Sequence, residues 1–366
     1  MINRRTTLKM MGAAGALATL GGPLGAQAAT GVHNADKGTR LQRILFGSCA
    51  HQDKDQPIWT PINAMNPDLF IFLGDNIYAD TRDMDVMAEK YKKLARKQGF
   101  QDLIAKTPVI ATWDDHDYGE NDSGFDYPMK EPSKAQFLDF WDTPKSSPRR
   151  RADDGVYMSY EYGPADQRVQ VILLDLRWNR TPLKAVSKAE AKRRDQMAFG
   201  PYLPQSGPGI TMLGEKQWAW LEGELRKPAK VRIIGSSLQF ISTFPGWEGW
   251  SLFPGERQRM IDLINRTGAE GVLFISGDTH WAEISLQDTH VPYPLYDFTS
   301  SGLTQTWYNM SPNVYRMPGC MYTDVNFGIL EIDWNVPDPQ IVMQARDVNG
   351  KPVFEKSILL SELSRR

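Results

Sequence analysis

The run Leu69-Phe70-Ile71-Phe72-Leu73 is entirely apolar and ends at Gly74-Asp75, followed by Asn76-Ile77-Tyr78. A short continuous apolar run bounded by glycine is typical of a β-strand that is buried on both faces. Gly74 allows the backbone to turn sharply after the strand, so the carboxylate of Asp75 comes directly at the strand end. The stretch therefore predicts a buried strand that delivers an acidic side chain to one edge of a sheet.

The same pattern recurs along the chain, with polar residues wherever an apolar run ends. The further predicted strands are 41–46, 109–113, 169–174, 231–234 and 272–275. Helical stretches lie between several of them, at 85–97, 214–227 and 256–265. This alternation indicates an α/β fold. The segment 296–355 carries β-type runs and a turn signal at Asn349-Gly350, so we expect it to form a second, largely antiparallel sheet packed on the first.

The overall composition limits the class of protein. The chain has 366 residues, 41% of them hydrophobic, which is enough for a substantial core. Its 42 basic and 44 acidic residues give a formal net charge of -2, which argues against a stable nucleic-acid partner. Attraction for an anionic substrate must then be local, as a metal site would provide. Because the sequence contains no repeat and no convincing linker, we expect a single domain over 41–366.

The N-terminus has the pattern of an export signal. Arg4-Arg5 precedes a mildly apolar run rich in alanine and glycine, and Ala26-Gln27-Ala28 offers small residues for cleavage. Paired arginines suggest a twin-arginine signal peptide over 1–28, followed by a leader over 29–40. The rival interpretation, a membrane anchor, is disfavoured because the run is short and glycine-rich. We therefore expect a periplasmic or secreted protein that engages the twin-arginine export machinery and keeps no transmembrane anchor after processing.

Four strand ends carry residues that can bind metals. Cys49 and His51 follow the first strand, where Cys49 could be a ligand or one half of a disulfide with Cys320. Asp75 offers a hard oxygen that could bridge two cations. Tyr78 could reach the same side, and its phenolate would need a strongly acidic ion such as ferric iron.

The other two strand ends are more acidic or contain histidine. Residues 114–122 hold five carboxylates around His116, and such a group repels itself unless cations compensate. Asp278 and His280 alternate after a strand, so both could point into one pocket. Each ending alone could be an ordinary turn or helix cap. Four of them after buried-type strands favour one shared metal site.

Together these segments resemble the alkaline phosphatase D (PhoD) family. The resemblance is carried by five motifs that occur in the family's order and span about two-thirds of the mature chain: FGSC at 46–49, GDNIY at 74–78, WDDHD at 113–117 with Asn121 following, LLDLR at 173–177 and SGDTH at 276–280. It implies a calcineurin-like metallophosphatase core, a four-layered α/β/β/α sandwich with mixed sheets. It also implies a ferric ion with calcium, and hydrolysis of phosphate monoesters and diesters.

The resemblance also implies roles for individual residues. Cys49 and Tyr78 match the iron ligands, and Asp75 matches the bridging carboxylate. Asp115 matches a metal ligand, and His116 matches the neighbouring acid or phosphate-contacting residue. The remaining matches are Asn121 as a metal or phosphate contact, and Asp278 with His280 as the final ligand pair. The chain departs from the family in lacking the long N-terminal β-domain of larger members. It also has His51 and Asn76 at positions where other residues are common.

We therefore predict an exported metal-dependent phosphatase or phosphodiesterase acting on a small phosphate ester. His116 would donate a proton to the leaving group, and Arg177 would fork onto phosphate oxygens unless it forms an ordinary salt bridge. An unpaired Cys49 thiolate would bind iron, and Cys320 would be dispensable.

Two alternatives remain open. The first is a phospholipase D-like or nucleotide phosphodiesterase, with a wider pocket lined by 246–250, Trp307 and Tyr308, aromatics that could equally be core residues. The second, a non-catalytic exported calcium- or carbohydrate-binding protein, leaves Cys49 and His280 without a shared role. A serine hydrolase is disfavoured because the sequence has no Gly-x-Ser-x-Gly elbow.

Overall fold

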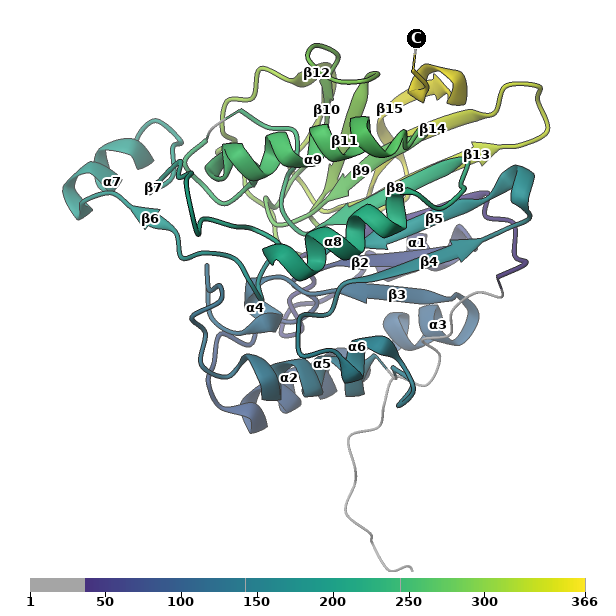
Figure 1. Cartoon of the computed structure of the whole chain (residues 1–366). Coiled ribbons are helices and arrows are strands. Elements are labelled where there is room, and N and C mark those ends of the chain that lie inside the picture. The colour runs from purple at the N-terminus through teal and green to yellow at the C-terminus, as the bar shows by residue number, and fades with distance from the viewer. Residues whose placement is uncertain (1–36, 142, 244, 366) are drawn as a thin grey trace, which may run out of the picture.

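The computed structural model describes residues 37–141, 143–243 and 245–365. Two large mixed sheets lie face to face, and helices cover their outer faces (Figure 1). The predicted α/β fold with mixed sheets is confirmed. The predicted signal peptide over 1–28 and most of the leader over 29–40 lie outside the described residues.

The first sheet has the strand order β15-β14-β13-β1-β2-β3. Strands β1, β2 and β3 run parallel, and β13 pairs antiparallel with β1. The bounds are β1 Arg43–Gly47, β2 Leu69–Leu73, β3 Val109–Thr112, β13 Asn326–Asp333, β14 Gln340–Asp347 and β15 Pro352–Leu359.

The second sheet has the strand order β12-β10-β11-β9-β8-β5-β4. Strands β5, β8, β9 and β11 are parallel neighbours, and the remaining pairs are antiparallel. The bounds are β4 Met158–Tyr162, β5 Val169–Leu173, β8 Val231–Ser236, β9 Val272–Ser276, β10 Ala282–Gln287, β11 Leu295–Ser300 and β12 Arg316–Tyr322. A short hairpin of β6 (Lys184–Ala185) and β7 (Tyr202–Leu203) stands apart from both sheets.

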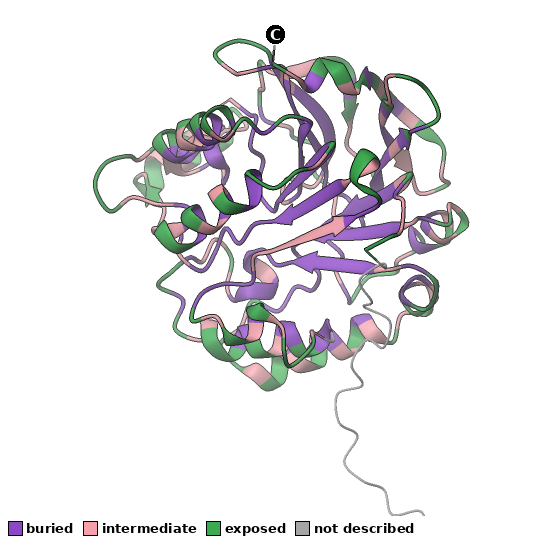
Figure 2. Cartoon of the chain, turned by 45° about the vertical axis from the view of Figure 1, so that its right-hand side comes forward, coloured by how far each residue is buried: buried purple, intermediate pink, exposed green. Residues whose placement is uncertain are grey.

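Alternation along β2 explains the layers. Ile71 belongs to the hydrophobic core shared with the second sheet, whereas Phe70 and Phe72 belong to the core beneath the helices of the first sheet. Phe46 of β1 meets Phe298 of β11 edge to face at 5.0 Å between ring centroids, so the two sheets pack directly on each other. The strands are buried at the centre and the outer helix faces are exposed (Figure 2).

The helices form the two outer layers (Figure 1). On the first sheet lie α1 Trp59–Ala64, α2 Met84–Ala95, α3 Gln98–Lys106, α5 Lys130–Phe140 and α6 Pro148–Arg151. On the second lie α8 Gly214–Leu225 and α9 Pro254–Thr267. The caps explain some of these limits: Asp83 accepts hydrogen bonds from the first turn of α2, and Gly268 ends α9 in the left-handed conformation. The short α4 (Asp115–Tyr118) and the exposed α7 (Lys188–Asp195) lie outside these layers.

The predicted strands and three predicted helices are present with small shifts at their ends. The expectation for 296–355 is wrong, because its strands do not form a sheet of their own. Strands β11 and β12 complete the second sheet, while β13, β14 and β15 extend the first through the pairing of β13 with β1. In the described part of the chain, no helix is long and apolar enough to cross a membrane.

Candidate metal centre

The ends of strands from both sheets meet at one edge of the sandwich. Cys49 follows β1 and Asp75 follows β2, while Asp115 begins α4 directly after β3. Asp278 and His280 follow β9 of the second sheet. Ligand sites in α/β sheets lie beyond the carboxyl ends of parallel strands, and here two such edges face each other.

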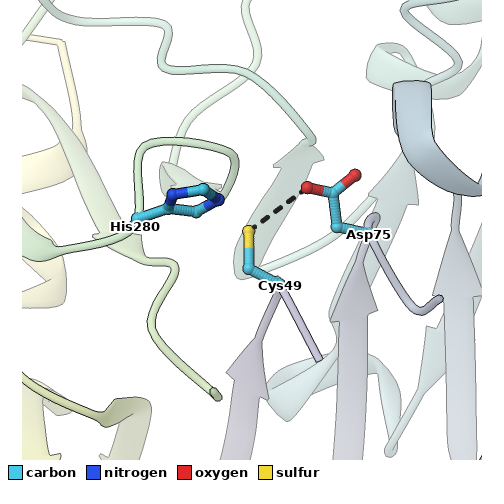
Figure 3. A group of neighbouring side chains, drawn as sticks. All are labelled: Cys49, Asp75 and His280. Carbon is cyan, nitrogen blue, oxygen red and sulfur yellow. Dashed lines mark hydrogen bonds between the residues drawn. The ribbon is translucent and has the colours of Figure 1, made fainter. Parts of the chain in front are cut away.

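Four of the predicted ligands touch one another at the centre of this edge. The Tyr78 hydroxyl donates to Oδ2 of Asp75 at 3.2 Å and lies 3.1 Å from Nε2 of His280. The Cys49 thiol lies 3.4 Å from the same Asp75 oxygen. Figure 3 shows Cys49, Asp75 and His280 pointing toward one another from three separate loops. The structure thus brings together a sulfur, a phenol oxygen, a carboxylate and an imidazole.

The backbone at these positions is unusual. Cys49, Asp75, Asp278 and His280 have φ angles of 64°, 51°, 66° and 64°, in the left-handed region that non-glycine residues rarely adopt. Such strain costs about 1 kcal/mol or more per residue and persists where surrounding structure enforces it. Here hydrogen bonds between loops do so: the Ala50 amide donates to the Asp75 carbonyl, and the His280 amide donates to Ser301.

Burial shapes the protonation of this group. It raises the pKa of the Cys49 thiol to about 12, and it raises the pKa of Asp75 and Tyr78 well above their ordinary values. Burial lowers the pKa of His280 to about 4, so its imidazole is neutral and its lone pair is available. Oδ1 of Asp75 is buried and has no hydrogen-bond partner within the described residues. A cation reverses the penalty on buried anions, so this donor set fits a metal ion.

A second group of oxygens adjoins the first. Ligand atoms of Asp114, Asp115 and Asp278 lie within 4.8 Å of one another, and Asp75 with Asp115 and His116 forms a further group. Burial raises the pKa of Asp115, but the charges of Arg177 and His116 outweigh it, so the pKa is low and the group is a carboxylate. Asp75 belongs to the sulfur-containing group and also to the group with Asp115, which is itself a member of the oxygen group, and this is the placement expected of a bridging ligand.

His116 lies beside the cluster. Its ring stacks on Tyr78 at 4.2 Å between centroids, and Nδ1 lies 2.7 Å from Oδ1 of Asp80. Burial alone would lower the pKa of His116, but the charges of Asp75, Asp115 and Asp80 raise it to about 11. The side chain is 15% exposed, so a protonated imidazole reaches the surface of the cluster and is held in place by Asp80.

Arg177 makes salt bridges, the alternative that the sequence left open beside a phosphate contact. Its side chain is fully buried, Nε donates to Asp114 at 2.6 Å, and Nη1 donates to Glu248 at 2.9 Å. Its role as a fork onto phosphate oxygens stays a prediction. It supports Asp114 and Asp115 from behind.

Asn121, predicted as a metal or phosphate contact, lies at the protein surface. It is exposed, whereas its neighbour Asp122 joins Asp115 and Glu248 in a third acidic group. Arg177 and Arg180 form ion pairs with Glu248. Since two arginines already compensate the third group, its charge does not require a metal ion. The role of the exposed Asn121 as a metal or phosphate contact stays a prediction.

Sequence reasoning missed several supporting residues. Asp117, one of the five carboxylates, accepts hydrogen bonds from the amides of Asp75 at 3.1 Å and Asp114 at 2.7 Å, and thereby joins the ends of β2 and β3. Its spacing in the acidic stretch could have signalled this role. Ser301 lies 3.2 Å from the Cys49 sulfur, and no local sequence signal marks it.

The cysteines answer the question left open by the sequence. Cys49 and Cys320 are both free and buried. Cys49 lies in the cluster, and Cys320 lies in β12. The prediction that Cys49 is unpaired is therefore confirmed.

The aromatic residues considered for a wider pocket divide into two sets. Trp250 is fully buried and packs edge to face on Phe240, so it belongs to the core. Trp247 is half-buried, while Trp307 and Tyr308 are exposed.

Comparison with known proteins gives a consistent result. The family model described as PhoD-like phosphatase matches residues 44–309. Alkaline phosphatase D of Bacillus subtilis (strain 168) is 20% identical over 282 residues, which cover 67% of this chain and 47% of that protein. The chain therefore spans about half the length of this curated relative.

Solved structures share the fold. A structure of PhoD has a TM-score of 0.64 and 15% identity, covering 87% of this chain and 69% of that one. A dimetal phosphatase from Danio rerio has a TM-score of 0.51 and 16% identity, covering 88% and 100%. The purple acid phosphatase PPD1 of yellow lupin has a TM-score of 0.55 and 11% identity, covering 88% and 54%. At these identities the likeness supports the fold.

Proposed function

The chain belongs to the PhoD-like phosphatase family, and we propose from this premise that it is a metal-dependent phosphoric ester hydrolase. The observation that carries the proposal is the meeting of Cys49, Asp75, Tyr78 and His280 within hydrogen-bond distances at the edge between two sheets. A non-catalytic binding protein would have no need of a protonated His116 beside that group.

The residues divide between two ion positions. Cys49, Tyr78 and His280 would hold one ion, Asp115 and Asp278 would hold the other, and Asp75 would bridge them. Bound metal ions would offset the charge of the phosphate and lower the pKa of a coordinated water. The chain contributes preorganised loops, because Asp117 and Ser301 hold the ligands before any ion arrives.

The donor sets favour different ions. A thiolate with a phenolate favours a strongly Lewis-acidic transition metal, which supports ferric iron at the first position. An all-oxygen set favours a hard cation, which supports calcium at the second. We therefore propose ferric iron and calcium as the two ions.

His116 is the proposed general acid. It is partly exposed beside Asp75 and Asp115 and is oriented by Asp80, and the charges of these carboxylates raise its pKa, which favours the protonated form. A proton donated to the departing alkoxide would lower the cost of breaking the phosphorus–oxygen bond. Asp80 then acts as a positioning residue for the imidazole.

We further propose that the protein is exported through the twin-arginine pathway to the periplasm or beyond the cell. Support comes from Arg4-Arg5, the apolar run and Ala26-Gln27-Ala28. A route that carries folded proteins suits an enzyme whose metal ions bind before export.

Turnover tests the proposal directly. Purified full-length protein, loaded with ferric iron and calcium, should hydrolyse p-nitrophenyl phosphate or bis-p-nitrophenyl phosphate. Dialysis against a chelator should abolish turnover, and restoring the ions should recover it. Elemental analysis should find bound metal in the active sample. Stoichiometric metal without turnover of either ester would favour the non-catalytic alternative.

A further inference from the structure

Two tryptophan side chains meet in loops next to the proposed metal ligands, and Tyr308 follows one of them in the sequence. Trp307 is 44% exposed and Tyr308 is 69% exposed, both in the segment that follows β11. Trp247, in the loop between β8 and α9, meets Trp307 at 6.3 Å between ring centroids with an interplanar angle of 64°. Single exposed aromatics are common, but two tryptophans from distant loops that touch and remain accessible mark a binding surface more often than a core.

The segment that carries Trp307 is fixed to two ligand loops. The Thr304 amide donates to the Cys49 carbonyl at 3.1 Å, and the Trp307 amide donates to the His280 carbonyl at 3.0 Å. The backbone that carries Trp307 is therefore held next to two of the proposed metal ligands.

The loop that carries Trp247 is fixed in a similar way. The next residue, Glu248, is buried and forms ion pairs with Arg177 and Arg180. Arg177 in turn pairs with Asp114 beside the oxygen ligands. The loop of Trp247 is thus anchored through this acidic cluster, whereas the segment of Trp307 is anchored through the backbone of Cys49 and His280.

A small pocket adjoins Trp247. It has a volume of about 20 Å³, room for about one water molecule. Trp247, Glu248, Thr279 and Trp281 are among its lining residues. Trp281 is 7% exposed, and its indole nitrogen has no partner within the described ranges. A buried donor without an acceptor indicates that a ligand atom or a bound water completes it.

We propose that Trp247, Trp307 and Tyr308 form an aromatic subsite that stacks a planar ring of the substrate, so the preferred substrates are phosphate esters of nucleosides or similar aryl-bearing alcohols. This inference rests on the proposed phosphoesterase function. Metal ions bound by the proposed ligands would hold the phosphate, and the exposed Trp307, in contact with Trp247, would stack on the ring. The hydroxyl of Tyr308 donates to Asp324 at 2.6 Å, which restrains that side chain.

The decisive measurement compares two inhibitors that differ by the base alone. Adenosine 5′-monophosphate and ribose 5-phosphate are titrated against hydrolysis of bis-p-nitrophenyl phosphate by metal-loaded full-length enzyme. Stacking of one base predicts that the nucleotide binds about ten-fold more tightly than the sugar phosphate. Trp307→Ala should bring the ratio of inhibition constants close to one, and Trp307→Phe should keep most of it.

The control is Trp220→Ala. Trp220 is a half-buried tryptophan on α8 that stacks with Tyr157, so its loss should leave the ratio unchanged. Equal inhibition by both compounds in the active wild type, or an unchanged ratio in Trp307→Ala, overturns the aromatic subsite while the phosphoesterase function stands. A metal-loaded wild type without turnover overturns both.

Discussion

The hydroxyl of Tyr78 lies 3.1 Å from Nε2 of His280, although the two residues are 202 positions apart and follow strands of different sheets. This contact exists only when both sheets are assembled face to face. The proposed metal centre is therefore a property of the whole sandwich, and ligand changes should affect metal binding more than folding.

Asp75→Asn and His280→Ala should each lower kcat/KM for an activated phosphate ester by at least about 100-fold and reduce the bound metal. Asp75 is buried with a raised pKa, so the neutral amide should leave the thermal midpoint of the metal-free protein unchanged or higher. His290→Ala is the matched control, because His290 is exposed and has a similar φ of 57°. Near-normal turnover in either ligand variant would remove the two-ion proposal.

Arg177→Met should destabilise the protein strongly, because it leaves Asp114 buried without its cation and leaves Glu248 paired with Arg180 alone. Breaking a buried ion pair from one side costs about 3–5 kcal/mol, which urea denaturation can measure. Lys216→Met provides the control, since the pair of Lys216 with Asp153 lies at the surface and its loss should leave the transition in place. A similar small effect in both variants would show that the buried network is not a stabilising one.

Much of the fold and of the site follows from local sequence. Strands β2 and β9 are continuous apolar runs, so their burial on both faces and their ends at Gly74-Asp75 and Gly277-Asp278 could be predicted. Because parallel strands of one sheet end at one edge, Cys49 and Asp75 could be predicted as neighbours. Their meeting with His280 also requires the two sheets to pack face to face.

What could not be predicted depends on pairing between distant segments. Strand β13 joins β1 across almost the whole chain, as in the register Ile44 with Leu330, and nothing local specifies which edge it extends. Glu248 lies in a loop between aromatic residues, and only the folded chain places it against Arg177. Asn121 and Asp122 are adjacent in one turn, so which of them faces the cluster depends on the backbone, where Asp122 has a φ of 58°.

Asp297 should make stability depend on pH. Burial raises the pKa of this carboxyl from 3.8 to about 6, although the amides of Phe240 and Ile241 donate to it. The folded state therefore binds the proton more tightly than the unfolded state, so stability from this group is present below about pH 4 and is lost as the pH rises through about 6. Between pH 4 and 7 the loss should be about 2 kcal/mol.

Asp297→Asn isolates that effect, because the amide cannot ionise. As the pH rises, the unfolding free energy of the wild type should fall relative to that of the variant. The contributions of all other carboxyls are the same in both proteins and cancel in the difference. A constant difference from about pH 4 to pH 7 would mean that hydrogen bonds from Ser276 and the two amides fully offset the burial of the charge.

Changing Arg4 and Arg5 together to lysine should block export. The twin-arginine route reads the arginine pair itself, so full-length precursor should accumulate in the cytoplasm and processed protein should disappear from the exported fraction. Cell fractionation with mass determination of the N-terminus provides the measurement. A variant that is processed and exported like the wild type would point to a different export route.

Cys49→Ser should remove or shift a visible absorption band that Cys320→Ser keeps. The Cys49 sulfur lies 3.4 Å from the carboxylate of Asp75 in the proposed iron position, and thiolate or phenolate bound to ferric iron gives charge-transfer colour. Burial raises the pKa of the thiol to about 12, so a cation must displace the proton for sulfur to bind. Absorption spectra of iron-loaded wild type and both variants provide the test.

The two cysteines make this comparison well matched. Both are buried and free, but Cys320 lies in β12 and belongs to the hydrophobic core. Its loss should therefore leave colour, iron content and turnover intact. Retention of the band at the same wavelength and intensity in Cys49→Ser would assign the colour to Tyr78 alone and exclude sulfur from the iron position. A band that shifts while iron remains bound would instead keep Cys49 as a ligand, because a change of donor atom alters the energy of the transition without emptying the site.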